Sequence, residues 1–339
     1  MSRITPLFLF SLLATATAAA AQPAPATPHE QPALHALAHA PSEAELRATI
    51  TKLVGFGTRH TLSDTTSDTR GIGAARRWVK SRFEAISRDC GGCIEVITPS
   101  QTFTGKRAPK PTEVVDVVAI KRGKRDPNRV IVMTGHLDSR VTDVMNATSD
   151  APGANDDASG VAALIEAARL LSKQDNDATL VFAALSGEEQ GLYGGKAYAA
   201  AHGKDAKDMA LHQIGAESDF GAGRIYAFNT GSAAPDASRA ATRQIAEVLA
   251  PLGIAYEPSK GGPGPDVGPI SAKGGAWAWL AQDGTDYFDL HHTADDTLDK
   301  IEPAALAQNV AAYTVFAYLA AEADGNFGSE AKATTPPNE

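Results

Sequence analysis

The sequence predicts an α/β protein with a mostly parallel, mixed central sheet and helices on both faces. Three observations support this fold class. Short apolar runs alternate along the chain with segments of helical apolar spacing. Residues 130–133 read Val-Ile-Val-Met, as expected of a strand that is buried on both faces. Polar clusters follow the strand-like runs, where an open α/β sheet places its ligand-binding loops.

Each predicted element follows from its local pattern. Helical spacing of apolar residues predicts helices at residues 43–53, 72–86, 158–171, 192–201, 238–249 and 303–321. Apolar and β-branched runs predict strands at residues 113–120, 129–134, 179–185, 224–228 and 276–281. Residues 209–215 form a weaker apolar stretch. Residues 261–269 are rich in Gly and Pro and are predicted to form a long loop that walls a pocket.

The two ends of the chain have compositions unlike a folded domain. Residues 1–21 resemble an export signal, with Arg3 at the start, an apolar run at residues 7–13, and small residues up to a cleavage point near Ala21. That run is too short to span a bilayer, and no later segment is predicted to span one. We therefore expect a flexible linker at residues 22–41, a single domain at residues 42–325, and a disordered tail at residues 326–339. The mature chain is expected to be a soluble monomer, periplasmic or secreted.

Charge and cysteine content narrow the function classes. The formal net charge is −9 and no dense basic run occurs, which argues against nucleic acid and anionic membranes as partners. The two cysteines, Cys90 and Cys93, form a Cys-Gly-Gly-Cys motif. A redox centre would have a helix opening just after the first cysteine, whereas here a helical run precedes the pair. We therefore predict a structural disulfide.

Three motifs carry the candidate chemistry. Gly-His-Leu-Asp-Ser at residues 135–139 places His136 and Asp138 at the end of a buried strand. Gly-Ala-Asn-Asp-Asp-Ala-Ser-Gly at residues 153–160 places Asp156 at a turn before a helix. Ser-Gly-Glu-Glu-Gln at residues 186–190 follows the next strand and contains Glu188 and Glu189. His and carboxylate groups from separate loops predict a metal site at one sheet edge.

The residue types also suggest a division of labour. A carboxylate close to a ligating histidine, as Asp138 is to His136, can accept its second ring N–H and set its tautomer. Neighbouring side chains of an extended Glu188–Glu189 pair would point opposite ways, so one can bind metal while the other faces substrate. This arrangement suits hydrolysis, in which a metal acidifies water and a carboxylate moves its proton.

These motifs, with Glu-Ser-Asp at residues 217–219 and His-Thr-x-x-Asp-Thr at residues 292–297, resemble the M28 family of co-catalytic zinc exopeptidases. The resemblance covers residues 46–321, and its specificity lies in the order and spacing of all five motifs. It implies a peptide substrate and two Zn²⁺ ions, although other divalent metals are compatible. It implies that Asp156 bridges the ions, that Glu188 is the general base and acid, and that Asp138 orients His136. It also implies a cis peptide between Asp156 and Asp157. The implied metal ligands are His136, Asp156, Glu189, Asp219 and His292.

Some assignments stay open at this point. Glu217 is an alternative to Asp219, and His291 is an alternative to His292. Within the family the motifs resemble both bacterial aminopeptidases and secreted dipeptidases of the carboxypeptidase Q type. A dipeptidase would need a cation for the substrate carboxylate; Arg59 and Arg140 are candidates, although surface ion pairs are the preferred interpretation for both. Asp266, Asp289 and Asp295 are candidates for an ammonium group in an aminopeptidase.

Three further functions are less compatible with the sequence than the exopeptidase. A relative with one zinc or none, such as a glutaminyl cyclase or a receptor ectodomain, is disfavoured because all five ligand positions are filled. A periplasmic solute-binding protein has similar length and export, but it would not need a Glu-Glu pair after a strand. A serine hydrolase is disfavoured because the chain lacks a Gly-x-Ser-x-Gly elbow.

Overall fold

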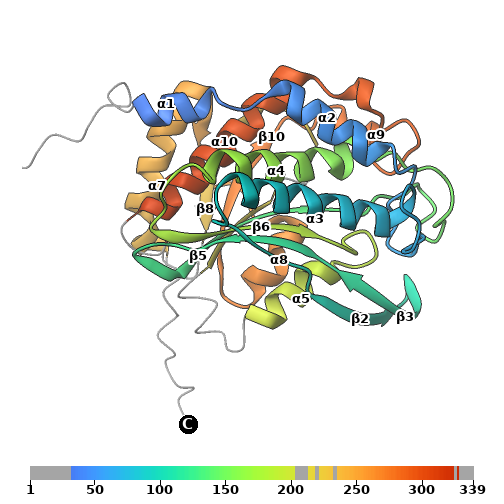
Figure 1. Ribbon diagram of the computed structural model, residues 1–339. Coiled ribbons are helices and arrows are strands. Elements are labelled where there is room, and N and C mark those ends of the chain that lie inside the picture. Colours follow the sequence, from blue (N-terminus) through green and yellow to red (C-terminus); the bar gives the residue numbers. More distant parts are fainter. Residues whose placement is uncertain (1–31, 203–212, 218–220, 232–234, 324–326, 328–339) are drawn as a thin grey trace, which may run out of the picture.

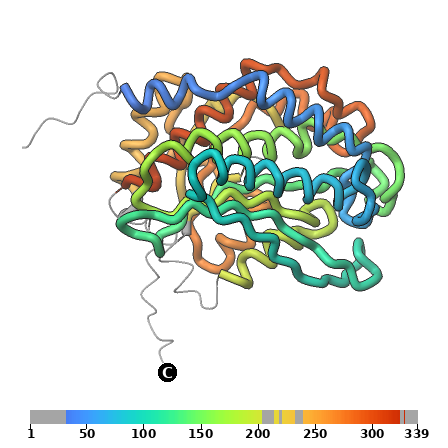
Figure 2. Tube along the Cα trace, viewed as in Figure 1, coloured from blue at the N-terminus to red at the C-terminus, as the bar shows by residue number. Residues whose placement is uncertain are grey.

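The computed structural model describes residues 32–202, 213–217, 221–231, 235–323 and 327, and these form three layers, a central sheet between two layers of helices (Figures 1 and 2). The export signal predicted at residues 1–21 lies outside the described residues. The long central strands run through the middle of the molecule, with a large helical layer on one side and a smaller one on the other.

The central sheet has eight strands in the order β1-β4-β6-β5-β7-β10-β8-β9. Strands β5, β6, β7 and β10 are mutually parallel neighbours, whereas β4 runs antiparallel to β6 and β8 runs antiparallel to β10. The strands are β1 (Glu95–Ile97), β4 (Val117–Lys121), β5 (Asp126–His136), β6 (Ala178–Leu185), β7 (Gln213–Glu217), β8 (Ile225–Gly231), β9 (Ala255–Tyr256) and β10 (Ala276–Gln282). A separate hairpin joins β2 (Ser100–Gly105) and β3 (Ala108–Val115). The predicted fold class is confirmed.

Helices cover both faces of the sheet (Figure 1). The larger layer contains α1 (Pro32–Ala38), α2 (Glu43–Val54), α3 (Gly71–Asp89), α4 (Ser159–Leu171), α7 (Pro235–Leu249) and α10 (Pro303–Glu322). On the opposite face α5 (Tyr193–His202) packs against α8 (Gly264–Ala272). The short helix α9 (Tyr287–Leu290) follows β10.

Alternate residues of the central strands belong to two different cores. On β6, Leu180, Phe182 and Ala184 face the larger helical layer, whereas Val181 and Ala183 face α5 and α8. Side chains of successive strand residues point to opposite faces, so a strand covered on both faces must be apolar throughout. This explains the nearly continuous apolar runs from which the strands were predicted.

Helix α10 is the one described helix that is long and apolar enough to cross a membrane. However, 72% of its most apolar window is buried inside the protein, in contact with α2, α4 and α7. A helix that is apolar on all sides is expected either in a membrane or in the centre of a large core. Its burial here is that of a core helix.

The structure differs from the sequence prediction at four places. The predicted strand at residues 113–120 is two strands, β3 and β4, separated at Asp116. The predicted loop at residues 261–269 contains most of α8. The predicted linker at residues 22–41 contains helix α1, whose Leu34 and Leu37 are buried. In the predicted disordered tail, Phe327 is buried in the main core, and the other residues of that tail lie outside the described part.

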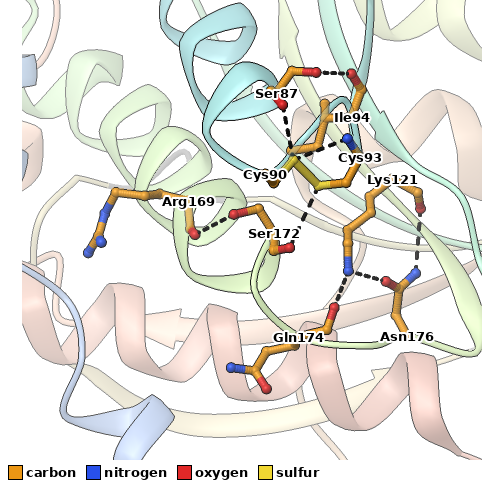
Figure 3. The surroundings of a disulfide bond; sticks show 9 residues. All are labelled: Ser87, Cys90, Cys93, Ile94, Lys121, Arg169, Ser172, Gln174 and Asn176. Atoms are coloured by element: carbon orange, nitrogen blue, oxygen red, sulfur yellow. Dashed lines mark hydrogen bonds between the residues drawn. A yellow bond between two sulfur atoms is a disulfide. The ribbon is translucent and has the colours of Figure 1, made fainter.

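The disulfide between Cys90 and Cys93 is present, as predicted (Figure 3). It closes the turn at the end of α3, where Gly91 and Gly92 both have positive φ, at 73° and 86°. Only glycine adopts this conformation readily, so the motif needs both residues between its cysteines. The pair packs against the main core, and the Cys93 sulfur lies 3.6 Å from the Ser172 carbonyl oxygen at the end of α4.

Candidate metal centre

The carboxyl ends of the parallel strands gather the predicted site residues at one edge of the sheet. His136, the last residue of β5, pairs in register with Leu185, the last residue of β6. On the other side of β5, Thr134 pairs with Glu217, the last residue of β7. The loops after β5, β6 and β7 therefore begin side by side, as expected for the ligand-binding edge of an open α/β sheet.

Asp156 lies between two histidines that come from loops far apart in the sequence. Its Oδ1 is 3.1 Å from His136 Nε2, and its Oδ2 is 3.2 Å from His292 Nε2. His292 Nε2 is also 3.0 Å from Glu189 Oε2. Asp156 and Glu189 are buried and His292 is partly exposed. The two oxygens of one carboxylate thus face two different imidazoles.

The main chain at Asp156 is held by the carboxylate of Asp296, a role that the sequence did not predict. Its N–H donates to Asp296 Oδ2 at 2.9 Å, and the Asn155 N–H donates to Asp296 Oδ1 at 2.8 Å. Asp157 accepts from His136 N at 2.8 Å and from Gly160 N at 2.8 Å, so it links β5 to the start of α4. The Asp156–Asp157 peptide is cis, as the resemblance implied. The available signal for Asp296 was its place in the motif at residues 292–297.

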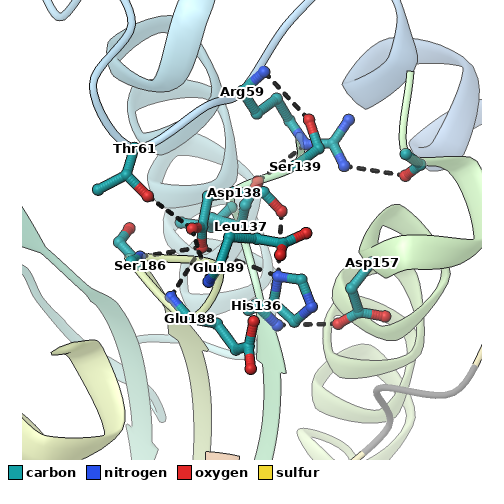
Figure 4. Close-up of polar contacts among 12 residues, drawn as sticks. Arg59, Thr61, His136, Leu137, Asp138, Ser139, Asp157, Ser186, Glu188 and Glu189 are labelled. Carbon is teal, nitrogen blue, oxygen red and sulfur yellow. Dashed lines mark hydrogen bonds and ion pairs between the residues drawn. The ribbon is translucent and has the colours of Figure 1, made fainter. Parts of the chain in front are cut away.

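The loop after β6 is wrapped around the carboxylate of Asp138 (Figure 4). Asp138 accepts hydrogen bonds from the N–H groups of Gly187 (2.9 Å), Glu188 (3.2 Å) and Glu189 (3.2 Å), and from the Thr61 hydroxyl at 2.6 Å. The loop is therefore not extended, and the alternation argued from extended backbone does not apply. Instead, a buried negative charge fixes three consecutive peptide units, and the two glutamate side chains leave the loop in different directions.

Asp138 also contacts His136, but through a different atom from the one expected. His136 Nδ1 lies 3.0 Å from the main-chain carbonyl oxygen of Asp138 and 3.8 Å from its Oδ1. The carbonyl is the hydrogen-bond acceptor that can hold Nδ1 protonated and leave Nε2 free to bind a metal. The Asp138 carboxylate instead accepts hydrogen bonds from the loop after β6.

Arg59 is wholly internal, so the expected surface ion pair is wrong. Its side chain is 1% exposed and donates to the main-chain oxygens of Leu137 (2.8 Å), Leu53 (3.3 Å), Pro152 (2.7 Å) and Gly153 (2.9 Å). Burial lowers the pKa of Arg59, while the nearby carboxylates of Asp296, Asp157, Asp156 and Asp138 raise it. The guanidinium ties together the segments that carry Asp138 and Asp156, and it offsets part of their charge.

Arg140 is also not a surface group. Its Nε lies 2.8 Å from Glu189 Oε2, and its side chain is largely buried. Burial acts to raise the pKa of Glu189, but hydrogen bonding to His292 and the charges of His136, His292 and Arg140 outweigh it and lower the pKa to about 2. Glu189 is therefore an anion at neutral pH, as a metal ligand must be.

The alternatives left open by the sequence are partly resolved. His292 contacts Asp156 and Glu189, whereas the His291 ring stacks on Tyr287 and its Nδ1 lies 3.3 Å from the Phe288 carbonyl oxygen. Asp219 lies outside the described residues. Glu217 Oε2 accepts from Val267 N at 2.9 Å, so that carboxylate is used to anchor α8. Asp266 is fully buried, whereas Asp289 and Asp295 are exposed.

The donors at this edge fit a bound metal ion. Ligand atoms of Asp156, Glu189 and His292 all lie within 4.8 Å of one another. Glu189 Oε1 is buried and has no hydrogen-bond partner in the described part of the chain. Burying an ionised oxygen without a partner is costly, and a cation would remove that cost. Imidazole nitrogens combined with carboxylate oxygens are the donors found in catalytic zinc sites.

The two adjacent histidines provide a matched test of this centre. We expect His292→Ala to weaken binding of a zinc ion on the order of 100-fold or more, because it removes a nitrogen that faces both Asp156 and Glu189. His291→Ala removes the same kind of side chain one residue away and should leave zinc affinity within about twofold. Competition titration against a chromogenic chelator measures both. Equal losses in the two variants would contradict the assignment of His292.

We expect Asp116, at the break between β3 and β4, to make the stability of the protein depend on pH. Burial raises the pKa of this carboxyl from 3.8 to about 7, although it accepts the Ser186 N–H at 2.8 Å. The pKa of Asp116 is higher in the folded chain than in the unfolded chain. Between about pH 4 and pH 7 the carboxyl is therefore protonated in the folded state and ionised in the unfolded state. This contribution therefore disfavours folding increasingly as the pH rises through that range.

Asp116→Asn should abolish this pH dependence, because an amide oxygen can still accept from Ser186 and cannot ionise. We expect the variant to be more stable than the native chain at pH 8 by on the order of 4 kcal/mol at most, with little difference at pH 4. Urea denaturation at the two pH values measures it. Parallel stability profiles for the two proteins would show that Asp116 is not the group responsible.

Comparison with known proteins places these features in a family. Residues 116–317 match the model of peptidase family M28, which is more than half of the chain. Over 152 residues the chain is 53% identical to a probable zinc metalloprotease of Pyricularia oryzae, which covers 44% of this chain and 30% of the relative. The chain thus spans less than a third of that relative's length.

Solved structures share the fold. A peptidase M28 precursor from Shewanella amazonensis is 37% identical, with a TM-score of 0.54 over 68% of this chain and 48% of the other. The LapA aminopeptidase of Legionella pneumophila has a TM-score of 0.63 at 19% identity, over 87% and 75% of the two chains. A glutaminyl cyclase from an Acidobacteriales bacterium has a TM-score of 0.59 at 19% identity, over 91% and 99%. By its match to the family model over residues 116–317, the chain belongs to peptidase family M28.

Proposed function

We propose that this chain is a zinc-dependent exopeptidase that removes residues from the N-terminus of peptides, with Glu188 as general base. The observation that carries the proposal is the position of Asp156, whose two oxygens face His136 and His292 at 3.1 and 3.2 Å. A carboxylate in this position is suited to bridge two ions, with Glu189 beside one of them. His136, Asp156, Glu189 and His292, together with Asp219, would hold the ions.

The bound ions would supply two things, namely acidification of a water molecule and polarisation of the scissile carbonyl. The chain's own residues do the rest. Glu188, partly exposed on the loop next to Glu189, would accept the proton of the attacking water and deliver it to the leaving amine nitrogen. Asp138 keeps that loop in place through three N–H groups, so the base is pre-positioned. Asp296 and Asp157 keep Asp156 and His136 in place.

A dipeptidase of the carboxypeptidase Q type is a second candidate, and Arg140 is the observation that favours it. Its guanidinium lies 2.8 Å from Glu189 and is 13% exposed, so a cation is present at the centre itself. Arginine binds carboxylates through paired N–H donors, and Arg140 could bind the free C-terminal carboxylate of a dipeptide in this way.

A panel of small peptides separates the two functions. Each dipeptide is offered free, N-acetylated and C-amidated, and release of amino acids is followed by chromatography. An aminopeptidase cleaves the free and amidated forms and fails on the acetylated form. Failure on the amidated form, with Arg140→Gln reducing cleavage of the free dipeptide, would instead support the dipeptidase.

Metal content tests the two-ion part of the proposal. Elemental analysis of the purified chain should find two zinc ions per molecule. One ion per molecule, with cyclisation of N-terminal glutamine in place of hydrolysis, would identify a glutaminyl cyclase activity.

Export is a separate proposal, which rests on residues 1–21. N-terminal sequencing of the mature protein from the periplasm or medium should begin at Gln22. Recovery of the full-length chain from the cytoplasm would contradict it.

A further inference from the structure

Arg76, on the first turns of α3, is a buried cation without a hydrogen-bond or ion-pair partner among the described residues. Its side chain is 8% exposed, and its Nε and Nη2 atoms are buried with no hydrogen-bond partner in the described part of the chain. Burying a charged guanidinium without hydrogen-bond partners is energetically costly. Burial lowers the pKa of Arg76, and the carboxylates of Asp138, Asp116 and Glu113 raise it through electrostatic attraction.

None of these three carboxylates serves as a full counter-ion. Both carboxylate oxygens of Asp138 already accept hydrogen bonds, from the Thr61 hydroxyl and from N–H groups of the loop after β6. Asp116 accepts from Ser186 N, and burial raises its pKa to about 7, so it carries only part of a charge at neutral pH. Glu113 lies on β3 with an exposed side chain.

Arg76 lines a pocket of about 870 Å³ between α3, the segment after Arg59, and strand β3. Three more cations line the same pocket, Lys110 from β3 and Arg77 and Lys80 from α3. Arg77 pairs with Asp68 at 3.3 Å and Lys80 with Glu84 at 3.2 Å, both outside the lining, and Glu113 is the single acidic side chain of the lining among the described residues. A recess lined by charges of one sign concentrates ions of the opposite sign. None of the four predicted metal ligands that the structure describes, His136, Asp156, Glu189 and His292, lines this pocket.

We propose that this pocket is an oxyanion-binding site, in which Arg76 binds a phosphate or carboxylate group and Arg77, Lys80 and Lys110 attract it. A planar guanidinium pairs with such groups through two parallel N–H donors. The pocket is separate from the proposed metal centre, but Thr61 connects the two. It lines the pocket and donates to Asp138.

Direct binding tests the proposal without any peptidase assay, so its failure is distinguishable from failure of the proposed function. Isothermal titration calorimetry with inorganic phosphate and, separately, with succinate should show saturable binding of one anion per chain. Sodium chloride at matched ionic strength is the reference. Preference for phosphate over succinate, or the reverse, identifies the source of the oxyanion. Absence of saturable binding for both anions overturns the proposal.

Variants locate the site. Arg76→Gln should lower the affinity tenfold or more, and Lys110→Gln, on a solvent-facing residue, should lower it about threefold through lost attraction. Arg88→Gln removes the same charge from an exposed position on the same helix outside the pocket and should leave affinity unchanged. If Arg76→Gln fails to fold, comparing the anion affinities of Lys110→Gln and Arg88→Gln still tests where the anion binds. Equal affinities in these two variants contradict the location.

Glu113 provides the remaining control. If anions bind at Arg76, Glu113→Gln should strengthen binding severalfold, because it removes the negative charge of the acidic side chain that lines the pocket. Binding that appears only in Glu113→Gln and not in the native chain would identify Glu113 as the natural counter-ion and overturn the proposal.

Discussion

Replacing Glu188 by glutamine is expected to lower kcat by a factor of about 10³ to 10⁴ while zinc content stays at the native level. General-base catalysis contributes on this scale, and an amide of the same shape cannot accept the proton of water. The variant should not disturb the ligands, because the Asp138 carboxylate holds the Glu188 main-chain N–H rather than its side chain.

Three measurements define this prediction: kcat on a free dipeptide, zinc by elemental analysis, and thermal unfolding. Glu188→Asp is the matched control, since it keeps the carboxylate but withdraws it from the substrate side, and it should retain more activity than the glutamine variant. Native-like turnover by Glu188→Gln would falsify its role as the base, whereas loss of zinc in that variant would reassign Glu188 as a ligand.

Asp156→Ala is expected to remove activity and to leave less than one zinc ion bound per chain. The reason is geometric: one carboxylate faces both His136 and His292, so its loss weakens both ion positions together. Asp295→Ala, which truncates an exposed aspartate in the loop that also carries His292, is the control and should keep the native zinc content.

Thermal unfolding with and without zinc distinguishes this effect from simple misfolding. A ligand that binds only the folded state stabilises it by about 4 kcal/mol when its concentration is a thousand times Kd. The native chain should therefore melt at a higher temperature with zinc than with a chelator, and Asp156→Ala should melt at the same temperature in both. A zinc-dependent rise as large as that of the native chain would contradict the bridging role.

Much of the fold could be predicted because local patterns agreed with the tertiary structure. The apolar run at residues 130–133 lies in a strand covered on both faces, and the helical spacing at residues 158–171 belongs to a helix that is almost wholly buried. The prediction failed where tertiary contacts override local composition. Residues 264–272 are rich in Gly and Pro, yet they form α8, which packs on α5 and donates to Glu217 through Val267.

Some residues of the candidate site could likewise be predicted from the sequence, and others could not. His136 could be named from its residue type and its place after a buried strand, whereas the choice of Glu189 over Glu188 as a ligand came from the family resemblance. The buried arginines could not be named, because nothing local distinguishes Arg59 from a surface arginine. Its role depends on carbonyl oxygens from residues 53, 137, 152 and 153, which only folding brings together.

The sequence by itself determined the fold class, the order of the strands and helices that matter for the site, the disulfide, and the family resemblance that implied the set of ligands. These depend on residue type and on spacing over short stretches, which the chain carries whatever its conformation. Only the tertiary structure decided which histidine of the adjacent pair faces Asp156, which atom of Asp138 contacts His136, and that Arg140 reaches Glu189. Those outcomes depend on the directions of side chains and on distances of a few ångströms between them, and the energy of a charge or hydrogen bond in the interior changes steeply over such distances.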